Sequence, residues 1–322
     1  MKKIPVVFAF DDNYALPASI AIKSLLDSKK KSTHYDIFVL YDDLKAETIE
    51  KIESITKINW VKVDRNLLKN APRTDHWPLS VYYRLFIADL IPQYDKIIWS
   101  DVDVLFTGDL SDVYNMNIDD VDWAGIAAEK RSETNGVHQH FPENKKPFVI
   151  MSGFLLINAK QWREKNMLSR FFDTIGKYNT KLKMFDLEVL NLAVDKIAPI
   201  PFNYCVLENL YVAEDFHTAP EYPWLSHVYS DKKLQNAIDH PVIIHYAGPA
   251  VKIWNRSFNE IPGYYWKYLE KSPFYNHDYY FPGINTRIKM SILWLLIKIT
   301  PIKKWRKRMR NTRRKLSSVA GK

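Results

Sequence analysis

The stretch IIWSDVDVLFTG, residues 97–108, places two aspartates directly after an apolar run. The run predicts a buried strand over 96–99, so Asp101 and Asp103 follow its carboxyl end. Alternate residues of an extended chain share a face, and two carboxylates on one face can chelate one hard cation. Without a cation they would repel each other, and the pKa of one would rise. Asp-x-Asp is also common in solvated loops and helix caps, and it is the preceding strand that favours a site.

Strand and helix patterns alternate on both sides of this stretch. Residues 4–10 predict a buried strand that leads into a helix over 16–26. The further expected strands are 35–40, 60–63, 123–128, 154–158 and 242–246, and the further expected helices are 45–55, 80–90, 160–178 and 186–194. The alternation predicts an α/β fold in which helices cover both faces of a mainly parallel sheet. Ligands of such sheets bind at the carboxyl edge of the strands.

The composition is that of a globular protein with a sizeable core. The chain has 322 residues, of which 47% are hydrophobic and 14% aromatic. Its one cysteine, Cys205, cannot form an intramolecular disulfide, which fits a reducing cytoplasm. The start, MKKIPVVFAFDDNY, resembles a signal peptide only superficially, because Pro5 interrupts the apolar run and no small-residue cleavage site follows. We therefore expect a first core strand there.

A histidine at the end of a late apolar strand is a candidate third ligand. His245 lies in VIIHY, residues 242–246, beside a Gly-Pro turn. Two carboxylates and an imidazole suit Mn²⁺ well and Mg²⁺ less easily. A single histidine at such a position is more often a core residue with satisfied hydrogen bonds. His245 and the two aspartates therefore indicate a metal site only in combination.

The first expected β-to-α turn, FAFDDNY at residues 8–14, lies where a nucleotide commonly docks in such folds. It has neither G-x-G-x-x-G nor G-x-x-x-x-G-K-[ST], which excludes a dinucleotide fold and a P-loop. Asp11 and Asn13 can hydrogen-bond a base or ribose, and Tyr14 offers a stacking face. The alternative is an Asx-type turn that caps the following helix.

Six blocks of the chain match one known family in order and spacing. They are FAFDDNY, SVYYRLFIADLIP, IIWSDVDVLFTGDL, SGFLLINAKQW, FDLEVLN and HYAGPAVKIW. With them the chain resembles glycosyltransferase family 8, the retaining group that includes bacterial lipopolysaccharide galactosyl- and glucosyltransferases and, more distantly, glycogenin. The resemblance covers roughly residues 4–275, and YYWKYLEKSPF resembles the region after the histidine block. It implies a GT-A fold that binds a UDP-sugar, with Mn²⁺ or Mg²⁺ between the diphosphate and the protein.

The resemblance also implies roles for individual residues. It assigns Ala9, Asp11, Asn13 and Tyr14 to uridine, Asp101, Asp103 and His245 to the metal with Val102 between them in the cofactor site, and Gly248 and Lys252 to the diphosphate. It assigns donor contact to Arg84, the sugar hydroxyls to Asp186, and catalysis to Asp186, Glu188 and Arg84. A diphosphate leaving group develops negative charge, which a metal and a lysine neutralise without proton transfer.

The chain departs from the family pattern in three respects. Met151 stands where the family often has Asn, and Leu187 stands where its common Asp-Gln-Asp has Gln. The spacing from His245 to Lys252 is longer by one residue, which puts the reach of that lysine to the phosphate in question. Because Leu187 cannot be a nucleophile, we expect same-face attack by the acceptor, with positive charge stabilised by Asp186 or Glu188, rather than a covalent intermediate.

The carboxyl-terminal segment differs in character from the rest. Residues 303–315 contain nine Lys or Arg and no acid, so they account for the whole formal net charge of +9. The apolar SILWLLI, residues 291–297, is far shorter than the ~20 residues of a spanning helix. With Trp294 and Trp305 it predicts a helix in the interface of an anionic membrane. Nucleic-acid binding and a solubilising tail are the alternatives, and the apolar segment favours the membrane.

These observations lead to one principal hypothesis. We expect a GT-A catalytic domain over 1–275 and a membrane-association tail over 276–322, placed on the cytoplasmic face of the cell membrane. The enzyme would transfer galactose or glucose from UDP-galactose or UDP-glucose to a lipopolysaccharide or other cell-surface glycan, with a lipid-linked acceptor and no nucleic acid as partners. The alternatives are a membrane-associated nucleotide-sugar-binding protein with little turnover and a self-glucosylating initiator of the glycogenin type. The sequence does not select the donor sugar.

Overall fold

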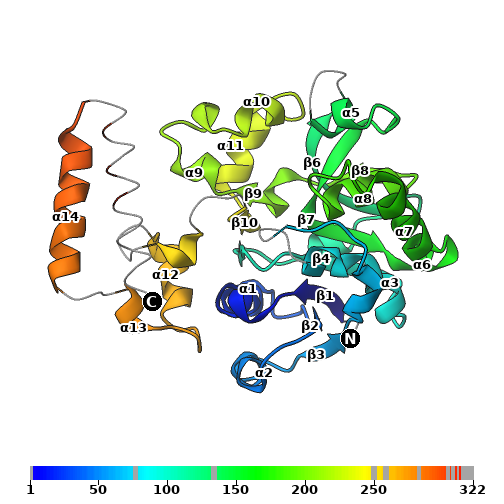
Figure 1. Cartoon of the computed structure of the whole chain (residues 1–322), viewed down its shortest axis with the longest axis horizontal. Coiled ribbons are helices and arrows are strands. Elements are labelled where there is room, and N and C mark those ends of the chain that lie inside the picture. Colours follow the sequence, from blue (N-terminus) through cyan, green and yellow to red (C-terminus); the bar gives the residue numbers. More distant parts are fainter. Residues whose placement is uncertain are drawn as a thin grey trace. The chain divides into compact units, whose positions relative to one another are not determined.

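The central sheet has seven strands in the order β3-β2-β1-β4-β7-β6-β8 (Figure 1). The structure, a computed structural model, describes residues 3–74, 79–131, 136–247, 252–256, 261–280 and 284–301, together with Trp305, Met309 and Thr312. The strands of the central sheet are β1 (Ile4–Ala9), β2 (Tyr35–Tyr41), β3 (Asn59–Lys62), β4 (Lys96–Ser100), β6 (Trp123–Lys130), β7 (Phe148–Asn158) and β8 (Ile197–Pro199). A second sheet, in the order β5-β10-β9, is formed by β5 (Val104–Phe106), β9 (Val206–Leu207) and β10 (Ile243–His245).

The first half of the central sheet is parallel. β1 pairs in parallel with β2 and with β4, and β2 pairs in parallel with β3. Helices α1 (Ala15–Ser28) and α2 (Ala46–Glu53) connect these strands, as the alternating pattern predicts. β7 runs antiparallel to both of its neighbours, β4 and β6, while β6 and β8 are parallel. The predicted α/β fold with a mainly parallel sheet is confirmed, and β7 is its antiparallel member.

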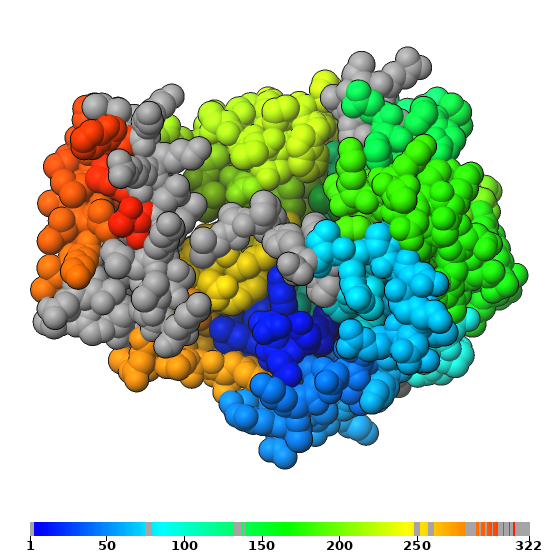
Figure 2. Space-filling view, in the orientation of Figure 1, coloured from blue at the N-terminus to red at the C-terminus, as the bar shows by residue number. Residues whose placement is uncertain are grey.

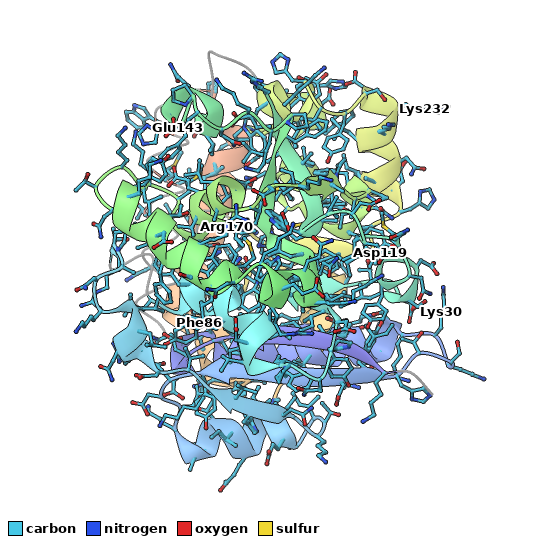
Figure 3. The ribbon with its side chains drawn as sticks, turned by 90° about the vertical axis from the view of Figure 1, so that its right-hand side faces the viewer. Lys30, Phe86, Asp119, Glu143, Arg170 and Lys232 are labelled. Atoms are coloured by element: carbon cyan, nitrogen blue, oxygen red, sulfur yellow. The ribbon has the colours of Figure 1, made fainter. Side chains whose placement is uncertain are left out.

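Both faces of the central strands are buried, which explains their continuous apolar runs. On one face Val7 and Trp99 belong to a core that includes residues of η3 (Leu79–Phe86), α3 (Ile87–Leu90), α6 (Ala159–Glu164), α7 (Met167–Tyr178) and α8 (Asp186–Ala193). Figure 3 shows these helices from the side, with Phe86 and Arg170 labelled. On the other face Phe8 meets Phe106 of β5 edge to face, with 6.3 Å between ring centroids.

Two predicted helices differ from the structure. The helix expected over 160–178 is two helices, α6 and α7, because Asn166 between them adopts a left-handed conformation with φ of 49°. Asparagine tolerates that conformation, and its periodic neighbours gave no sign of the break. The helix expected over 80–90 is mostly the 3₁₀ segment η3, and only its last turn, α3, is α-helical. The single-helix prediction for each stretch was therefore wrong.

The chain divides into two compact units between His245 and Tyr246. The second unit contains α12 (Gly263–Leu269), α13 (His277–Tyr280) and α14 (Ile284–Ile299). Within it, Tyr246 meets Tyr265 edge to face, and the Tyr280 hydroxyl donates to the carbonyl of Trp254 at 2.6 Å. Among the helices that the structure describes, none is long and apolar enough to cross a membrane. The boundary expected at residue 275 stays a prediction.

Candidate functional site

The two sheets bring Asp101, Asp103 and His245 together. Asp101 follows the carboxyl end of β4, and Asp103 directly precedes β5. β10 pairs antiparallel with β5 so that His245, its last residue, lies opposite Val104. One ligand-type atom from each of the three side chains lies within 4.8 Å of the other two. Residues that are 142 positions apart in the chain, Asp103 and His245, thus become neighbours through strand pairing.

The three side chains form a closely coupled group of charges. The Nε2 atom of His245 lies 3.1 Å from Oδ1 of Asp103 and 3.8 Å from Oδ2 of Asp101. Burial raises the pKa of Asp101, and the neighbouring charge of Asp103 adds to this, while Arg84 opposes it. Burial alone would lower the pKa of His245, but Cys205 and Asp103 raise it well above its usual value. Two carboxylates and one imidazole are a donor set that fits a divalent cation such as Mn²⁺.

A bulge in β7 borders this group. Ile150 pairs with Ala127, and Leu155 pairs with Gly125. Between these two pairs, β7 therefore contains more residues than β6. The extra residues are in the segment 151–154, which begins with Met151. Bulges of this kind re-aim backbone and side chains and are common beside active sites. The bulge therefore places the MSGF segment next to the end of β4.

Gly153, in this bulge, is packed against the ligand group. A Cβ atom at Gly153 would lie 2.6 Å from Cε1 of His245 and 3.2 Å from Oδ2 of Asp101. The carbonyl of Gly153 also accepts a hydrogen bond of 2.8 Å from the backbone amide of Asp101. Real Cβ contacts are essentially never as short as 2.6 Å, so the imidazole can occupy this position only because residue 153 has no side chain, and the contact of 3.2 Å with the carboxylate would also be tight.

Arg84 connects the ligand group to a buried acid. Its Nη2 donates to Oδ1 of Asp101 at 2.9 Å, and its Nη1 lies 3.2 Å from Oδ2 of Asp186. Its Nε and Nη1 donate to the carbonyls of Val81 and Ser152. The residue is only 5% exposed, so the guanidinium is desolvated and its charge is balanced by the two acids. In this structure Arg84 orients Asp101 and Asp186, and its contact with a donor stays a prediction.

The ring of Trp99 packs against the guanidinium of the same arginine. The guanidinium carbon of Arg84 lies 4.5 Å from the centroid of the Trp99 ring. The indole Nε1 of Trp99 is 3.3 Å from Oδ1 of Asp101. Trp99 is the next-to-last residue of β4 and is 1% exposed, so its ring is enclosed by the core. A buried cation over an indole gains both ring attraction and a fixed orientation.

Asp186 and Glu188 begin the same short helix but have different surroundings. Asp186 is 1% exposed, and burial raises its pKa to about 6 although Arg84 and Ser152 act in the opposite direction. Oε2 of Glu188 accepts hydrogen bonds from the backbone amides of Lys183 and Met184 at 2.6 and 2.9 Å. Glu188 therefore organises the loop before α8, while Asp186 joins the ion-pair network. A catalytic role of either residue stays a prediction.

The residue before Asp186 carries backbone strain. Phe185 has φ of 39°, a left-handed value that is uncommon for an aromatic residue. It is 5% exposed, and its ring meets that of Tyr82 with 6.3 Å between centroids. Strain of this kind costs roughly 1–3 kcal/mol and persists where the surrounding packing over-determines it. The buried ring thus holds the turn that presents Asp186.

The first β-to-α turn lies at the same edge of the sheet. β1 and β4 are adjacent and parallel, so Ala9 and Ser100 mark carboxyl ends that point the same way. Oδ1 of Asp11 accepts hydrogen bonds from the backbone amides of Asn13 and Tyr14 at 3.0 and 3.2 Å. These bonds form the Asx-type capping turn that is the alternative to a nucleotide contact. Asn13 is exposed, and Figure 2 shows the deep-blue start of the chain reaching the surface. The turn is accessible, and its contact with uridine stays a prediction.

Other predicted residues are placed less directly. Val102 is 5% exposed and packs in the core between the two aspartates. Nζ of Lys252 donates to the carbonyl of Tyr246 at 3.0 Å and lies 5.8 Å from the ring centroid of Trp254. Gly248 lies outside the described residues. The diphosphate roles of Lys252 and Gly248 stay predictions.

Three neighbours of the ligand group had no assigned role in the sequence analysis. They are Gly153, Trp99 and Cys205. Their contacts come from residues far apart in the chain, so spacing alone could not show them. The SGF motif was a usable signal, because a glycine inside a strand often marks a bulge or a close backbone approach.

A cavity of about 730 Å³ lies away from this site. Its lining includes Lys96, the first residue of β4, and Asn158, the last residue of the antiparallel β7. These residues lie at the edge of the sheet opposite to Asp101. The acid–imidazole group, rather than this cavity, is therefore the candidate active site.

Comparison with known proteins identifies the class. The family model "Glycosyl transferase family 8" matches residues 5–257. The chain is 26% identical over 286 residues to a lipopolysaccharide 1,2-glucosyltransferase of Escherichia coli, covering 85% of this chain and 80% of the relative. It is 23% identical over 265 residues to a lipopolysaccharide 1,3-galactosyltransferase of Salmonella typhimurium, covering 79% and 73%. The solved structure of the galactosyltransferase LgtC with donor and acceptor sugar analogs superposes with a TM-score of 0.68 at 19% identity, over 86% of this chain and 99% of LgtC.

These comparisons agree with the geometry. The likeness to LgtC shows that the fold is of the GT-A type. The family match includes Asp101, Asp103, Asp186 and His245, and members of the family generally use a UDP-sugar and a divalent metal. The predicted enzyme class is confirmed: this chain belongs to glycosyltransferase family 8.

Proposed function

We propose that this enzyme transfers a hexose, galactose or glucose, from its UDP conjugate to a lipopolysaccharide or other cell-surface glycan, with retention at the anomeric carbon. The choice of hexose and acceptor is supported by the glucosyl- and galactosyltransferases of lipopolysaccharide among its relatives. The observation that carries the proposal is the gathering of Asp101, Asp103 and His245 at the carboxyl end of β4. It lies where α/β sheets bind nucleotides.

Asp101, Asp103 and His245 would hold Mn²⁺ or, less easily, Mg²⁺. When bound, a divalent ion neutralises the negative charge that develops on the UDP leaving group. Arg84 holds Asp101 in position through the hydrogen bond of 2.9 Å from its Nη2. Three protein ligands leave coordination positions open for oxygens of the substrate.

The chain's own residues favour same-face attack. The residue between Asp186 and Glu188 is Leu187, which is partly buried against the core and has no nucleophilic atom. The bond from the sugar C1 to the β-phosphate oxygen breaks, and the acceptor hydroxyl oxygen bonds C1 on the same face. The hydroxyl proton passes to the departing phosphate oxygen. Asp186 would stabilise the positive charge at C1 and bond the sugar hydroxyls, which gives retention without a covalent intermediate.

The proposed site is tested by UDP release. The protein is incubated with UDP-galactose or UDP-glucose and Mn²⁺, with and without EDTA, and UDP is quantified. Asp101→Asn and Asp103→Asn should each abolish the metal-dependent release. Asp112→Asn is the control, because Asp112 is an exposed acid of α4 (Ser111–Tyr114) that pairs with Lys30. Full release by both site variants would reject the metal site.

A second candidate is a nucleotide-sugar-binding protein with little turnover. It is favoured by Met151 and Leu187, where the family pattern has amide side chains that can bond a sugar. Binding of UDP-sugar, measured by calorimetry, and UDP release are compared in one preparation. Tight binding without release from any donor would favour this candidate, whereas release at a rate typical of enzymes would exclude it.

We also propose that the carboxyl-terminal segment attaches the enzyme to an anionic membrane. Its exposed apolar residues follow helical spacing along α14 and are Ile288, Ile292, Leu295, Leu296 and Ile299, between 38% and 64% exposed. Trp305 is 64% exposed as well. Nine basic residues over 303–315 follow this stripe and would supply about 1 kcal/mol each near an anionic surface. Attachment at the cytoplasmic face would bring the site to a lipid-linked acceptor.

Vesicle partitioning tests the attachment. Deletion of residues 284–322 should release the protein from anionic vesicles, while vesicles of neutral lipid should bind the whole chain only weakly. Serine at Ile288, Ile292 and Ile299 should weaken binding with the basic charges intact. Unchanged partitioning of the deletion variant would reject a role of this segment. The same variant tests whether the catalytic domain ends near residue 275.

A further inference from the structure

The Nδ1 side of His245 is occupied by the buried thiol of Cys205. The Cys205 Sγ atom lies 3.2 Å from Nδ1, and Cys205 is 0% exposed. Cys205 directly precedes β9, and β9 pairs with β10 so that Leu207 lies opposite His245. The backbone amide of Glu208 donates to the carbonyl of His245 at 3.0 Å. The contact between thiol and imidazole is therefore fixed by strand pairing.

The position of the ring proton decides whether His245 can bind a cation. A neutral imidazole carries one proton, on Nδ1 or on Nε2. Nε2 is the atom that faces Asp103 and Asp101, at 3.1 and 3.8 Å. A proton on Nε2 would point at the cation and block ligation. A proton on Nδ1 leaves the Nε2 lone pair free, and that proton needs an acceptor, because a buried donor without a partner is destabilising.

The ring is also prevented from turning away. A Cβ at position 153 would lie 2.6 Å from Cε1 and 3.0 Å from Nδ1 of His245, so the backbone of Gly153 is against the ring edge. The Sγ atom of Cys205 lies next to Nδ1, on the adjoining part of the ring. His245 itself is 6% exposed. Sulfur is the acceptor that the described structure offers to Nδ1 at hydrogen-bonding distance.

We propose that Cys205 is a positioning residue whose sulfur accepts a hydrogen bond from Nδ1–H of His245 and thereby keeps the Nε2 lone pair aimed between Asp101 and Asp103. Ligating histidines generally donate their other ring N–H to such an outer partner, and loss of the partner typically costs 10–100-fold in metal affinity. The proposal rests on the metal site of the proposed function. It assigns the chain's only cysteine a role in metal binding without making it a ligand or a nucleophile.

The affinity for Mn²⁺ alone tests the role of the thiol. Free Mn²⁺ is followed by electron paramagnetic resonance in the wild type, Cys205→Val and Cys205→Ser. Valine fills the space without an acceptor, so its Kd should rise about 10–100-fold. Serine keeps an acceptor oxygen, so its Kd should stay within about threefold of wild type. Equal affinity in wild type and the valine variant would overturn the proposal, whereas no Mn²⁺ binding by the wild type would instead reject the metal site.

The tautomer is measured independently in the wild type saturated with Mg²⁺, because in the metal-free protein the Asp103 carboxylate, 3.1 Å from Nε2, can itself accept a hydrogen bond from Nε2–H. Nitrogen-15 histidine spectra distinguish a ring protonated on Nδ1 from one protonated on Nε2. The signal of His245, one of nine histidines, is assigned by its loss in His245→Gln. The spectrum is recorded at a pH high enough for the ring to be neutral. A Nδ1-protonated ring supports the proposal, and a Nε2-protonated ring overturns it even if the valine variant does not fold.

Discussion

The proposed metal end and the proposed sugar end of the site are built in different ways. At the metal end, Asp101, Asp103 and His245 are tied together by strand pairing and by contacts to Arg84, Cys205 and Gly153. At the sugar end, Met151 and Leu187 are half-buried apolar residues at positions where the family pattern has amides. A residue that supports several others cannot change without disturbing them. A residue whose main partner is the substrate can change while the fold remains, and we infer that this is why Met151 and Leu187 depart from the family pattern at the proposed sugar end.

The comparison predicts its largest effect at Arg84. Arg84→Ala removes the counter-charge of the buried Asp186 and of the partly buried Asp101, which should lower the free energy of unfolding by about 3–5 kcal/mol. The control is Arg170→Ala on α7, whose bidentate pair with Asp195 is partly exposed and should contribute less than about 1 kcal/mol. Both are measured by urea unfolding. Equal losses of unfolding free energy would show that the buried ion pairs of Arg84 stabilise the fold no more than an exposed pair does.

The second effect is a pH dependence that originates at Asp186. Burial raises its folded pKa to about 6, whereas the unfolded value is about 4. Between these values the folded protein keeps the proton that the unfolded chain has released, so stability falls as pH rises from ~4 to ~6, by about 3 kcal/mol in all. Unfolding is measured in EDTA at each pH, and Asp186→Asn should remove this part of the slope. The same slope in Asp186→Asn and wild type would assign it to another group.

A smaller loss of unfolding free energy is expected when a side chain is added at Gly153. Gly153→Ala forces His245 to move, and overpacking of this kind typically costs about 1–3 kcal/mol. The affinity for Mn²⁺ should fall with it, as seen by electron paramagnetic resonance. Gly176→Ala on α7 is the control, because its Cβ would meet nothing within 4 Å and alanine should stabilise the helix by about 0.5–1 kcal/mol. Normal Mn²⁺ binding by Gly153→Ala would show that the close approach is not needed.

The smallest effect on the fold should come from the sugar end. Met151→Asn and Leu187→Gln should leave the unfolding free energy nearly unchanged, because both residues are only half-buried. One added hydrogen bond to a sugar hydroxyl is worth about 1–1.5 kcal/mol, so the ratio of kcat/KM for UDP-galactose and UDP-glucose should change up to about tenfold. Kinetics with the two donors measure this ratio. An unchanged ratio in both variants would separate these positions from sugar recognition.

Much of the fold was predictable because it depends on local periodicity. The apolar runs of β1 and β4 predicted strands buried on both faces, and the alternation with helices predicted a mainly parallel sheet, which is confirmed. The break at Asn166 was missed, since a single left-handed residue leaves the apolar period of its neighbours intact. The antiparallel direction of β7 was missed as well. Strand direction depends on how the connecting segments cross the sheet, and a strand's own residues do not encode it.

The amino-acid sequence by itself determined which residue types stand at the site: the two aspartates after a strand, the histidine that ends another, and the motifs that resemble family 8. Only the tertiary structure decided that Arg84 joins Asp101 to Asp186, that Gly153 makes room for His245, and that Cys205 meets Nδ1 of its ring. The physical reason is one of range. Periodicity and local propensity act over a few residues, whereas these contacts join residues far apart in the chain, such as Arg84 with Asp186 and Gly153 with His245.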